Sequence, residues 1–260
     1  MAFYCLQKLN IQNSANTSDA RITVDDPKFM VSPALLLNMD QILLIDKPAG
    51  MTSHDVVDRV RHIFKTRSVG HAGTLDPFAT GLLILGVGAA TKRLSEYVGL
   101  DKTYEATARL GATSTTFDLE GVITETVGAN GVRPGARRAP LQDIEDVLNQ
   151  FRGGYEQKAP IFSAKKIHGK KLYELARRGQ ATEEMRPTKH VEIFELEVLN
   201  YKWPDLKFRV RCSSGTYVRS LADDIGRALG CGAYLTELRR TAIGSHRIEE
   251  ATPLDKLSSN

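Results

Sequence analysis

The first clear apolar run in the chain, residues 42–45, has the length and composition of a buried strand. Residues 46–50 contain proline and glycine and predict a turn after this strand. Apolar residues then recur at helical spacing over residues 56–64, with basic residues on the opposite face. We therefore predict a strand, a turn and an amphipathic helix, with Thr52 or Ser53 as the helix N-cap.

A polar, glycine-rich segment, residues 68–81, follows this helix and leads into a second apolar run at residues 82–85. Asp76 stands in its middle, and Pro77 restricts the backbone of that aspartate to extended conformations. The glycines of the segment allow tight turns or the close approach of another molecule. The pattern fits a nucleophilic carboxylate, but it also fits an ordinary Asp-Pro turn, and the segment alone leaves both interpretations open.

Farther along, helix-like and strand-like patterns are mixed, and several strand-like segments alternate apolar and polar residues. Because alternation is typical of a sheet with one solvated face, we expect an α+β fold with a central mixed, mostly antiparallel sheet flanked by helices and loops. We predict helices at residues 90–100, 141–151 and 217–229, strands at residues 104–110, 191–199 and 208–212, a loop at residues 125–140, and an apolar and basic segment at residues 234–240.

The composition is that of a globular protein, with 42% hydrophobic residues, 25% charged residues and a net charge of +4. This mild excess of positive charge permits a nucleic-acid partner without requiring one. The cysteines are far apart in the sequence and the histidines have no metal-binding spacing, so we expect neither disulfides nor a metal site. No apolar run approaches the roughly 20 residues of a membrane span, and the expected location is the reducing cytoplasm.

Residues 158–178 form the most basic part of the chain, with Phe162 and Tyr173 among the cations and Glu174 as the single acid. The basic residues of this window are Lys158, Lys165, Lys166, Lys170, Lys171, Arg177 and Arg178, together with His168. Clustered cations release counterions when they bind a polyanion, which predicts an arm that grips phosphates. A solvated loop and short helix explain the composition equally well, so composition leaves the two interpretations balanced.

Residues 1–38 are rich in Asn, Ser, Asp and Thr, and we interpret them as a mostly flexible N-terminal extension. They lack the long apolar centre of a secretory signal, and with one arginine and three aspartates they do not resemble a mitochondrial presequence. Met39 stands just before the first predicted strand, so an alternative hypothesis is that the natural chain begins there. The expected organisation is an extension at residues 1–38 and one domain at residues 39–260, with an arm at residues 158–178.

Five sequence blocks, in the same order, resemble the motifs of the TruB-type tRNA pseudouridine synthases. The blocks are residues 45–53 (IDKPAGMTS), residues 70–81 (GHAGTLDPFATG), residues 102–111 with KTY and RLG, residues 163–173 with SAKK and GKKLY, and residues 212–240 with CSSGTYVR, GCGA and LRR. Five blocks in order are far more specific than any single motif. The resemblance covers residues 41–245 and implies the pseudouridine-synthase fold with an RNA-gripping insertion.

Two features depart from that family's pattern. The extension at residues 1–38 is not part of it. The chain also stops at Asn260, which is too soon for the small C-terminal RNA-binding module of the PUA kind that the family usually carries. We expect this second departure to affect contacts to the far end of the tRNA rather than the catalytic blocks.

The resemblance implies an enzyme that isomerises uridine to pseudouridine at position 55 in the T-arm of tRNA, without a cofactor or a metal. This reaction detaches uracil from its ribose, turns the base over and rejoins it through carbon. It needs an ionised carboxylate near the anomeric carbon and a target base that has been flipped out of its stack. The implied partner is the T-arm stem-loop of tRNA, and the enzyme is expected to act as a monomer.

The same resemblance gives each motif residue a role. Asp76 would be the nucleophile, and Arg219 would pair with it and hold it charged. Tyr104 would stack on the flipped uracil, and His71 would lie by the vacated position and support flipping. Lys47 and Pro48 would pack beneath the catalytic loop, and Leu238 would line the pocket. The residues that would bind RNA are Lys165, Lys166, Lys170 and Lys171.

Two other functions fit parts of the pattern. A non-catalytic RNA-binding or tRNA-folding protein on the same fold would keep the basic arm, but it is expected to have lost Asp76. A glycosidase-like enzyme would need a second carboxylate as general acid, for which Asp223 and Asp224 are available, although we expect them to lie in a solvated turn. Lys47 and Leu238 also have plain structural interpretations, as a turn lysine and a core leucine.

Overall fold

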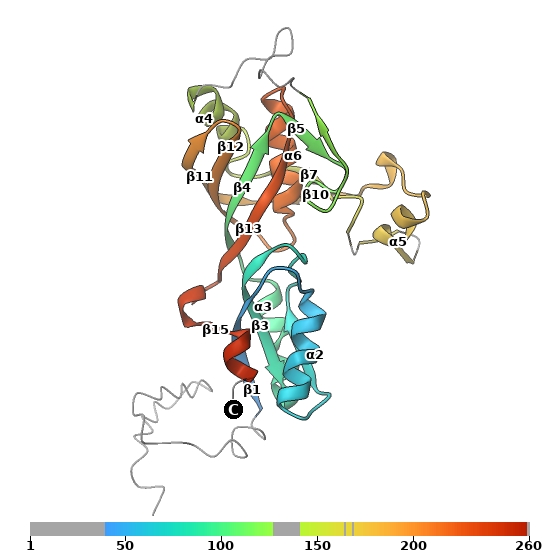
Figure 1. Ribbon diagram of the computed structural model, residues 1–260, viewed down its shortest axis with the longest axis vertical. Coiled ribbons are helices and arrows are strands. Elements are labelled where there is room, and N and C mark those ends of the chain that lie inside the picture. Colours follow the sequence, from blue (N-terminus) through green and yellow to red (C-terminus); the bar gives the residue numbers. More distant parts are fainter. Residues whose placement is uncertain (1–39, 127–140, 164, 168, 259–260) are drawn as a thin grey trace, which may run out of the picture. The chain divides into compact units, whose positions relative to one another are not determined.

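The structure is a computed structural model that describes residues 40–126 and 141–258, except residues 164 and 168. The predicted extension at residues 1–38 and nearly all of the predicted loop at residues 125–140 lie outside the described residues. The main sheet of the described residues runs in the order β11 (Ile193–Lys202), β12 (Asp205–Cys212), β4 (Lys102–Leu110), β13 (Ala233–Ile243), β3 (Thr80–Val87), β1 (Gln41–Lys47) and β15 (Thr252–Pro253) (Figure 1). Two further strands, β2 (Val69–Ala72) and β14 (His246–Arg247), pair with β3 and β13.

The strand pairs of this sheet are antiparallel, except that β13 with β3 and β1 with β15 are parallel. Helices lie against the sheet rather than alternating regularly with its strands. The predicted α+β fold with a mixed, mostly antiparallel sheet is therefore confirmed.

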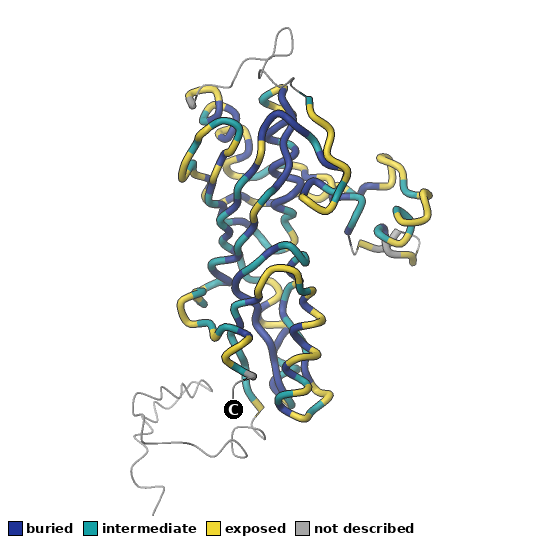
Figure 2. The backbone as a smooth tube through the Cα atoms, viewed as in Figure 1, coloured by how far each residue is buried: buried dark blue, intermediate teal, exposed yellow. Residues whose placement is uncertain are grey.

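Two helices, α4 (Leu141–Asn149) and α6 (Val218–Ala228), cover one face of the half-sheet that contains β11, β12, β4 and β13 (Figure 1). Every second residue of β4 is buried, as expected for a strand with one covered face. Ala106 of β4 belongs to the same buried apolar cluster as Leu221 and Ile225 of α6. Figure 2 shows this burial along the central strands and α6, so the core lies between the sheet and the helices.

The other half of the sheet packs on helix α2 (Ser53–Ile63), which shares an apolar cluster with β1 and β3. Thr52 is the N-cap, because its side chain accepts a hydrogen bond from the backbone N–H of Asp55 while the Asp55 carboxylate accepts one from the N–H of Thr52. The Ser53 hydroxyl accepts a hydrogen bond of 2.8 Å from the backbone N–H of Leu75. The start of α2 is thus tied to the loop that precedes β3.

The two halves meet where β13 and β3 pair in parallel, with Arg239 opposite Thr80 and Arg240 opposite Gly81. Gly81 has a φ of +105°, and a Cβ at this position would lie 2.3 Å from the backbone oxygen of Arg240. Glycine is therefore required for the strands to approach this closely. Because the Asp76 loop ends at the start of β3, this close approach fixes the loop at the junction of the two halves.

Several elements differ from the prediction. The turn predicted at residues 46–50 begins later, because β1 pairs with β3 as far as Lys47. The segment at residues 68–81 is not loop throughout, since its beginning forms β2 against β3. The helix predicted at residues 90–100 is replaced by a 3-10 helix, Gly88–Arg93, and a short α3, Ser95–Val98. In each case tertiary strand pairing or packing overrides the local pattern.

The remaining elements are short. Three two-stranded pairs join β5 (Ala112–Ser114) with β6 (Ile123–Glu125), β7 (Tyr155–Lys158) with β10 (Thr188–Val191), and β8 (Lys166–Ile167) with β9 (Lys170–Lys171), which leads into α5 (Leu172–Arg177). The 3-10 helices besides the one named above are Glu183–Met185, Ile248–Glu250 and Leu254–Ser258. The strand predicted at residues 191–199 is divided, because Val191 ends β10 and Ile193 begins β11.

Helix α6 lies so close to β13 that a side chain does not fit at Gly226. A Cβ at this position would lie 2.2 Å from the backbone nitrogen of Ala233. We expect Gly226→Ala to lower the free energy of unfolding by at least about 2 kcal/mol, because overpacking against backbone must be relieved by moving the strand or the helix. Urea unfolding followed by circular dichroism measures this change.

Gly99→Ala is the matched control, because nothing lies within 4 Å of a Cβ at Gly99 and its φ is −77°. The control is expected to change stability by less than about 1 kcal/mol. Equal stabilities of the two variants would contradict the close approach of α6 and β13.

Candidate active site

Asp76 lies in the loop before β3, and Arg219 lies in the first turn of α6. The guanidinium contacts the carboxylate twice, with Nε 2.9 Å from Oδ2 and with Nη2 donating a hydrogen bond of 3.2 Å to Oδ1. The N–H of Nε does not point at an acceptor, so the first contact is ionic. The Arg219 side chain is 7% exposed and the Asp76 side chain 34%. A carboxylate open to solvent is therefore backed by a buried positive charge.

A second carboxylate, Asp118, holds the same guanidinium from the turn region after β5. Its Oδ2 lies 3.0 Å from Arg219 Nη1, and its side chain is 2% exposed. Arg219 also donates hydrogen bonds to the backbone oxygens of Thr116, at 2.9 Å, and Phe162, at 3.3 Å. Asp118 in turn accepts hydrogen bonds from the Thr116 hydroxyl and from the backbone N–H of Glu120. The orientation of Arg219 is thus fixed by several segments at once.

Lys47 is fully buried beneath the loop that carries Asp76. Its Nζ donates hydrogen bonds to the backbone oxygens of Pro48 at 2.9 Å, Met51 at 2.6 Å and Pro77 at 3.2 Å. Burial lowers the pKa of Lys47 to about 8, although the negative charge of Asp76 opposes this shift. Lys47 therefore joins the turn after β1 to the loop that carries Asp76, while Pro48 itself is exposed.

His71 lies in β2 and is half-buried. Burial lowers the pKa of its imidazole, and the positive charges of Arg240 and His54 lower it further. Its Nδ1 is buried and has no hydrogen-bond partner among the described residues. The structure thus favours the neutral form of this imidazole and leaves one buried ring nitrogen without a partner among the described residues.

Tyr104 and Leu238 lie on the neighbouring strands β4 and β13, and both belong to the buried apolar cluster that also contains Leu75 of the Asp76 loop. Tyr104 is 9% exposed and Leu238 is 6% exposed. Burial raises the pKa of the Tyr104 phenol, while the nearby charge of Arg240 opposes that shift. The two side chains form an apolar wall beside the loop.

Arg240 is a buried cation that joins the Asp76 loop to the sheet. Its side chain is 1% exposed, Nε donates a hydrogen bond of 2.7 Å to the backbone oxygen of Leu82, and Nη2 donates one of 3.0 Å to that of Gly73. It also lies opposite Tyr104 in the register of β13 and β4. The arginine therefore contacts both the start of the loop and the strand at its end.

Sequence reasoning did not assign a role to Asp118 or Arg240. Asp118 lies outside the recognised blocks, and Arg240 was noted only as part of the LRR motif. The available signal for Asp118 was physical, because a buried arginine that faces a partly exposed carboxylate needs a further partner. The sequence offers several acids for that purpose, and the tertiary structure is what selects one.

The prediction that Asp223 and Asp224 lie in a solvated turn is wrong. Asp223 is 2% exposed and pairs with Arg227 at 2.8 Å, and burial raises its pKa to about 6. Asp224 accepts a hydrogen bond of 2.9 Å from the Tyr155 hydroxyl, and burial raises the pKa of its carboxyl. Both acids are on α6, where packing buries Asp223 and partly buries Asp224. They are engaged in ion-pair and hydrogen-bond contacts that stabilise the helix.

The basic arm begins next to Arg219. The Arg219 side chain bonds the Phe162 oxygen, and the Ser220 hydroxyl donates a hydrogen bond of 3.0 Å to the backbone oxygen of Lys158. Lys165 and Lys170 are exposed. The side chains of Lys166 and Lys171 lie outside the described residues, as does His168. The root of the arm is thus in contact with the candidate site.

No group of three or more His, Cys, Asp or Glu side chains that could hold a metal ion occurs in the part of the chain that the structure describes. Among the same residues, no helix has the length and apolar character of a membrane span. Cys212 and Cys231 are buried free thiols.

Two family models match the chain. The model of the TruB family pseudouridylate synthases (N terminal domain) matches residues 61–218, and the model of the tRNA pseudouridylate synthase B C-terminal domain matches residues 219–260. Between them they cover Asp76, Tyr104 and Arg219.

Curated relatives named tRNA pseudouridine synthase B are similar over most of their length. The relative from Mycobacterium sp. (strain KMS) is 48% identical over 221 residues, which is 84% of this chain and 71% of the relative. The relative from Corynebacterium glutamicum (strain R) is 45% identical over 223 residues, covering 84% of this chain and 72% of the relative.

Among solved structures, a chain of a Cbf5-Nop10-Gar1 complex is similar with a TM-score of 0.64 and 28% identity. The similarity covers 86% of this chain and 55% of that chain. This chain therefore spans about half the length of that structural relative.

The buried pair of Asp118 and Arg219 predicts a large effect on stability. We expect Asp118→Asn to lower the free energy of unfolding by about 3 kcal/mol, because it leaves a buried guanidinium with Asp76 as its remaining carboxylate. Asp58→Asn is the control, since Asp58 pairs with Arg61 at 2.9 Å on an exposed face of α2. An exposed pair contributes less than about 1 kcal/mol. Urea unfolding of both variants checks the prediction, and a loss for Asp118→Asn no larger than the control's would contradict it.

Proposed function

The chain belongs to the TruB family of pseudouridylate synthases, and we propose that it converts uridine to pseudouridine at position 55, in the T-arm of tRNA, with Asp76 as the nucleophile. The tRNA as substrate class follows from the similarity to enzymes named tRNA pseudouridine synthase B. The observation that carries the nucleophile assignment is the pair of a solvent-open Asp76 and a buried Arg219, held in place by Asp118.

The reaction breaks the bond between N1 of uracil and C1′ of the ribose and forms a bond between C5 and C1′. The Asp76 carboxylate attacks either C1′ or the base, and it leaves again by the end of the reaction. C5 loses a proton and N1 gains one, so no co-reactant is consumed. Arg219 balances the charge of the carboxylate and fixes its orientation, which prepares the site before the RNA binds.

The target base must leave the RNA stack, at a cost of a few kcal/mol. The apolar wall of Tyr104 and Leu238 offers a surface on which the uracil ring packs, and this contact offsets part of that cost. His71, whose pKa is lowered by burial, is proposed to lie beside the position that the base vacates. Lys47 supports the loop from beneath through its three backbone hydrogen bonds.

The lysines of residues 158–178 are proposed to bind phosphates of the T-arm. Lys165 and Lys170 support this role because they are exposed and have no ion pair among the described residues. Since Asp76, Asp118, Tyr104 and Arg219 all come from one chain, we also propose that the enzyme acts as a monomer. It is proposed to work in the cytoplasm, where its substrate is found.

We expect Asp76→Asn to abolish the product while tRNA binding stays close to that of the intact protein, because the amide keeps the shape of the carboxylate but is no nucleophile. The measurement is pseudouridine mapping of an unmodified tRNA transcript after incubation with each protein. Asp58→Asn, an exposed acid of α2, is the control and should form product at the normal rate.

If Asp76→Asn forms as much pseudouridine as the intact protein, Asp76 is not the nucleophile. If the intact protein binds tRNA but forms no pseudouridine, the protein is a non-catalytic RNA-binding protein and not an enzyme.

Replacing lysines of the arm should weaken tRNA binding. We expect the double variant Lys165→Gln/Lys170→Gln to reduce the slope of log affinity against log salt by about 2, because each phosphate contact contributes about 1. Extending the variant to Lys166 and Lys171 should reduce it further. The control is Lys202→Gln/Lys207→Gln, which removes the same charge from β11 and β12. If the arm variants bind tRNA as tightly as the intact protein, the proposed phosphate contacts are wrong and these lysines belong to an ordinary solvated surface.

A further inference from the structure

Several arginines on one face of the sheet are paired with neighbouring acids. We call the face opposite α6 the outer face. On it, Arg209 bonds Glu197 and Glu105, at 2.6 and 3.1 Å. The same pattern holds for Arg211 with Glu195 and Asp101, for Arg239 with Asp46, and for Lys207 with Glu105.

A hollow on the outer face has the same balance of charge. Its lining includes four acids and three arginines, which are Asp101, Glu105, Glu195, Glu249, Arg209, Arg211 and Arg247. A surface of this kind gives a polyanion no net attraction, because each phosphate would meet a carboxylate as well as a guanidinium.

Three cations differ from the paired ones of the outer face, one within α2 and two just after its C-terminal end. Arg59, Lys65 and Arg67 are exposed, and none of them has an ion pair among the described residues. The nearby Arg61 is instead paired with Asp58. Exposed cations without acidic partners are the groups that release counterions when they contact phosphates. We call Arg59, Lys65 and Arg67 the α2 patch.

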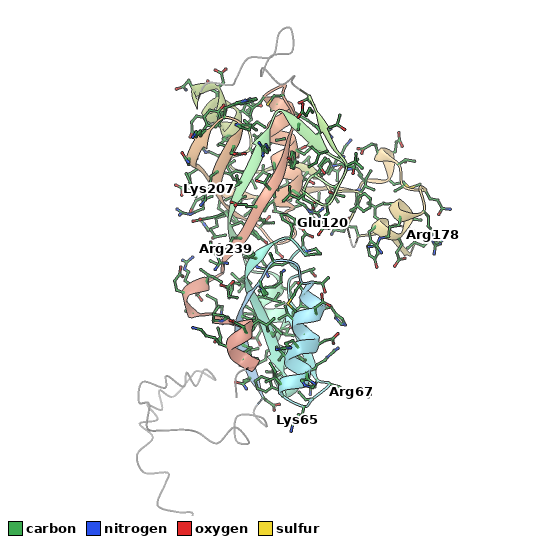
Figure 3. The ribbon with its side chains drawn as sticks, viewed as in Figure 1. Lys65, Arg67, Glu120, Arg178, Lys207 and Arg239 are labelled. Atoms are coloured by element: carbon green, nitrogen blue, oxygen red, sulfur yellow. The ribbon has the colours of Figure 1, made fainter. Side chains whose placement is uncertain are left out.

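The α2 patch lies a fixed distance from the catalytic loop. The N-terminus of α2 is bonded to that loop through Ser53 and Leu75. The helix has 11 residues and is therefore about 16 Å long, so Lys65 and Arg67 lie on the order of 16 Å from the loop. Figure 3 shows Arg67 and the arm residue Arg178 on one side of the molecule, and Lys207 and Arg239 on the other.

We propose that the α2 patch is a second phosphate-binding surface, which contacts the backbone of the tRNA helix that continues beyond the T-loop. This inference rests on the proposed function, because it takes the position of the flipped nucleotide at Asp76 as its origin. A duplex carries about one charge per 1.7 Å of its axis, so a stem that begins at the catalytic loop presents phosphates over the whole length of α2. The arm and the α2 patch then hold the RNA at two points, with the catalytic loop between them.

The proposal makes a distinction between long and short substrates. A hairpin with only the T-loop and about two or three base pairs ends before the C-terminal end of α2, whereas the longer stem of a whole tRNA also reaches Lys65 and Arg67. The α2 patch therefore contributes to affinity for whole tRNA and not to turnover of the bound nucleotide. Lys65 and Arg67 lie beyond the end of α2, away from the groups that contact Asp76.

The test compares two variants that remove equal charge. Arg59→Gln/Lys65→Gln/Arg67→Gln changes the α2 patch, and Arg109→Gln/Lys202→Gln/Lys207→Gln changes exposed cations elsewhere on the sheet. Binding of a whole tRNA transcript and of a short T-arm hairpin is measured over a range of salt concentrations. Circular dichroism checks that both variants are folded.

For whole tRNA, the α2-patch variant is expected to bind on the order of tenfold more weakly, with a salt slope lower by about 3, whereas the control keeps the affinity of the intact protein. For the hairpin, both variants are expected to bind and turn over like the intact protein. An equal loss for hairpin and tRNA, an equal loss in the control, or no loss would each overturn the proposal. Hairpin turnover by the intact protein tests the proposed function separately, so the failure of one is distinguishable from the failure of the other.

Discussion

A buried guanidinium is the group on which the arrangement of the site depends. A charge removed from water costs several kcal/mol unless it is paired and hydrogen-bonded. Arg219 meets this requirement with Asp118, Asp76 and the backbone oxygens of Thr116 and Phe162. Because these partners come from three segments, the set of contacts around Arg219 is complete only when all three have come together with α6. Asp76 is the partner that keeps access to solvent, so the same interaction that organises the fold also presents a carboxylate to a substrate.

Other buried cations use backbone oxygens instead of carboxylates. Lys47 bonds three carbonyls around the Asp76 loop, and Arg240 bonds those of Leu82 and Gly73. Lys102 bonds the carbonyls of Val98, at the end of α3, and of Leu100. A carbonyl satisfies a donor without cancelling its charge, so the region beneath the loop keeps a positive field. That field contributes to the lowered pKa of His71 and favours negative charge at the loop. The fold thus supplies electrostatic support for the carboxylate before any substrate binds.

The surface carries a related asymmetry of charge. The net charge of +4 says only that nucleic acid is a permissible partner. Pairing decides where that charge is available, because Arg209 and Arg211 are bound to acids while Lys165 and Lys65 are not. Unpaired cations on the surface attract a polyanion, and this attraction acts at long range when the salt concentration is low.

Local sequence determined the features that have a local physical cause. The spacing of apolar residues predicted α2 and α6, the N-cap residue types predicted the start of α2, and the Asp-Pro motif in its block singled out Asp76. The sequence pattern wrongly predicted one helix at residues 90–100 and a solvated position for Asp223. Packing between distant segments decides the conformation of the first and the burial of the second. The choice of Asp118 as a partner of Arg219 was likewise settled by tertiary structure alone, because an ion pair between residues 101 positions apart leaves no periodicity in the sequence.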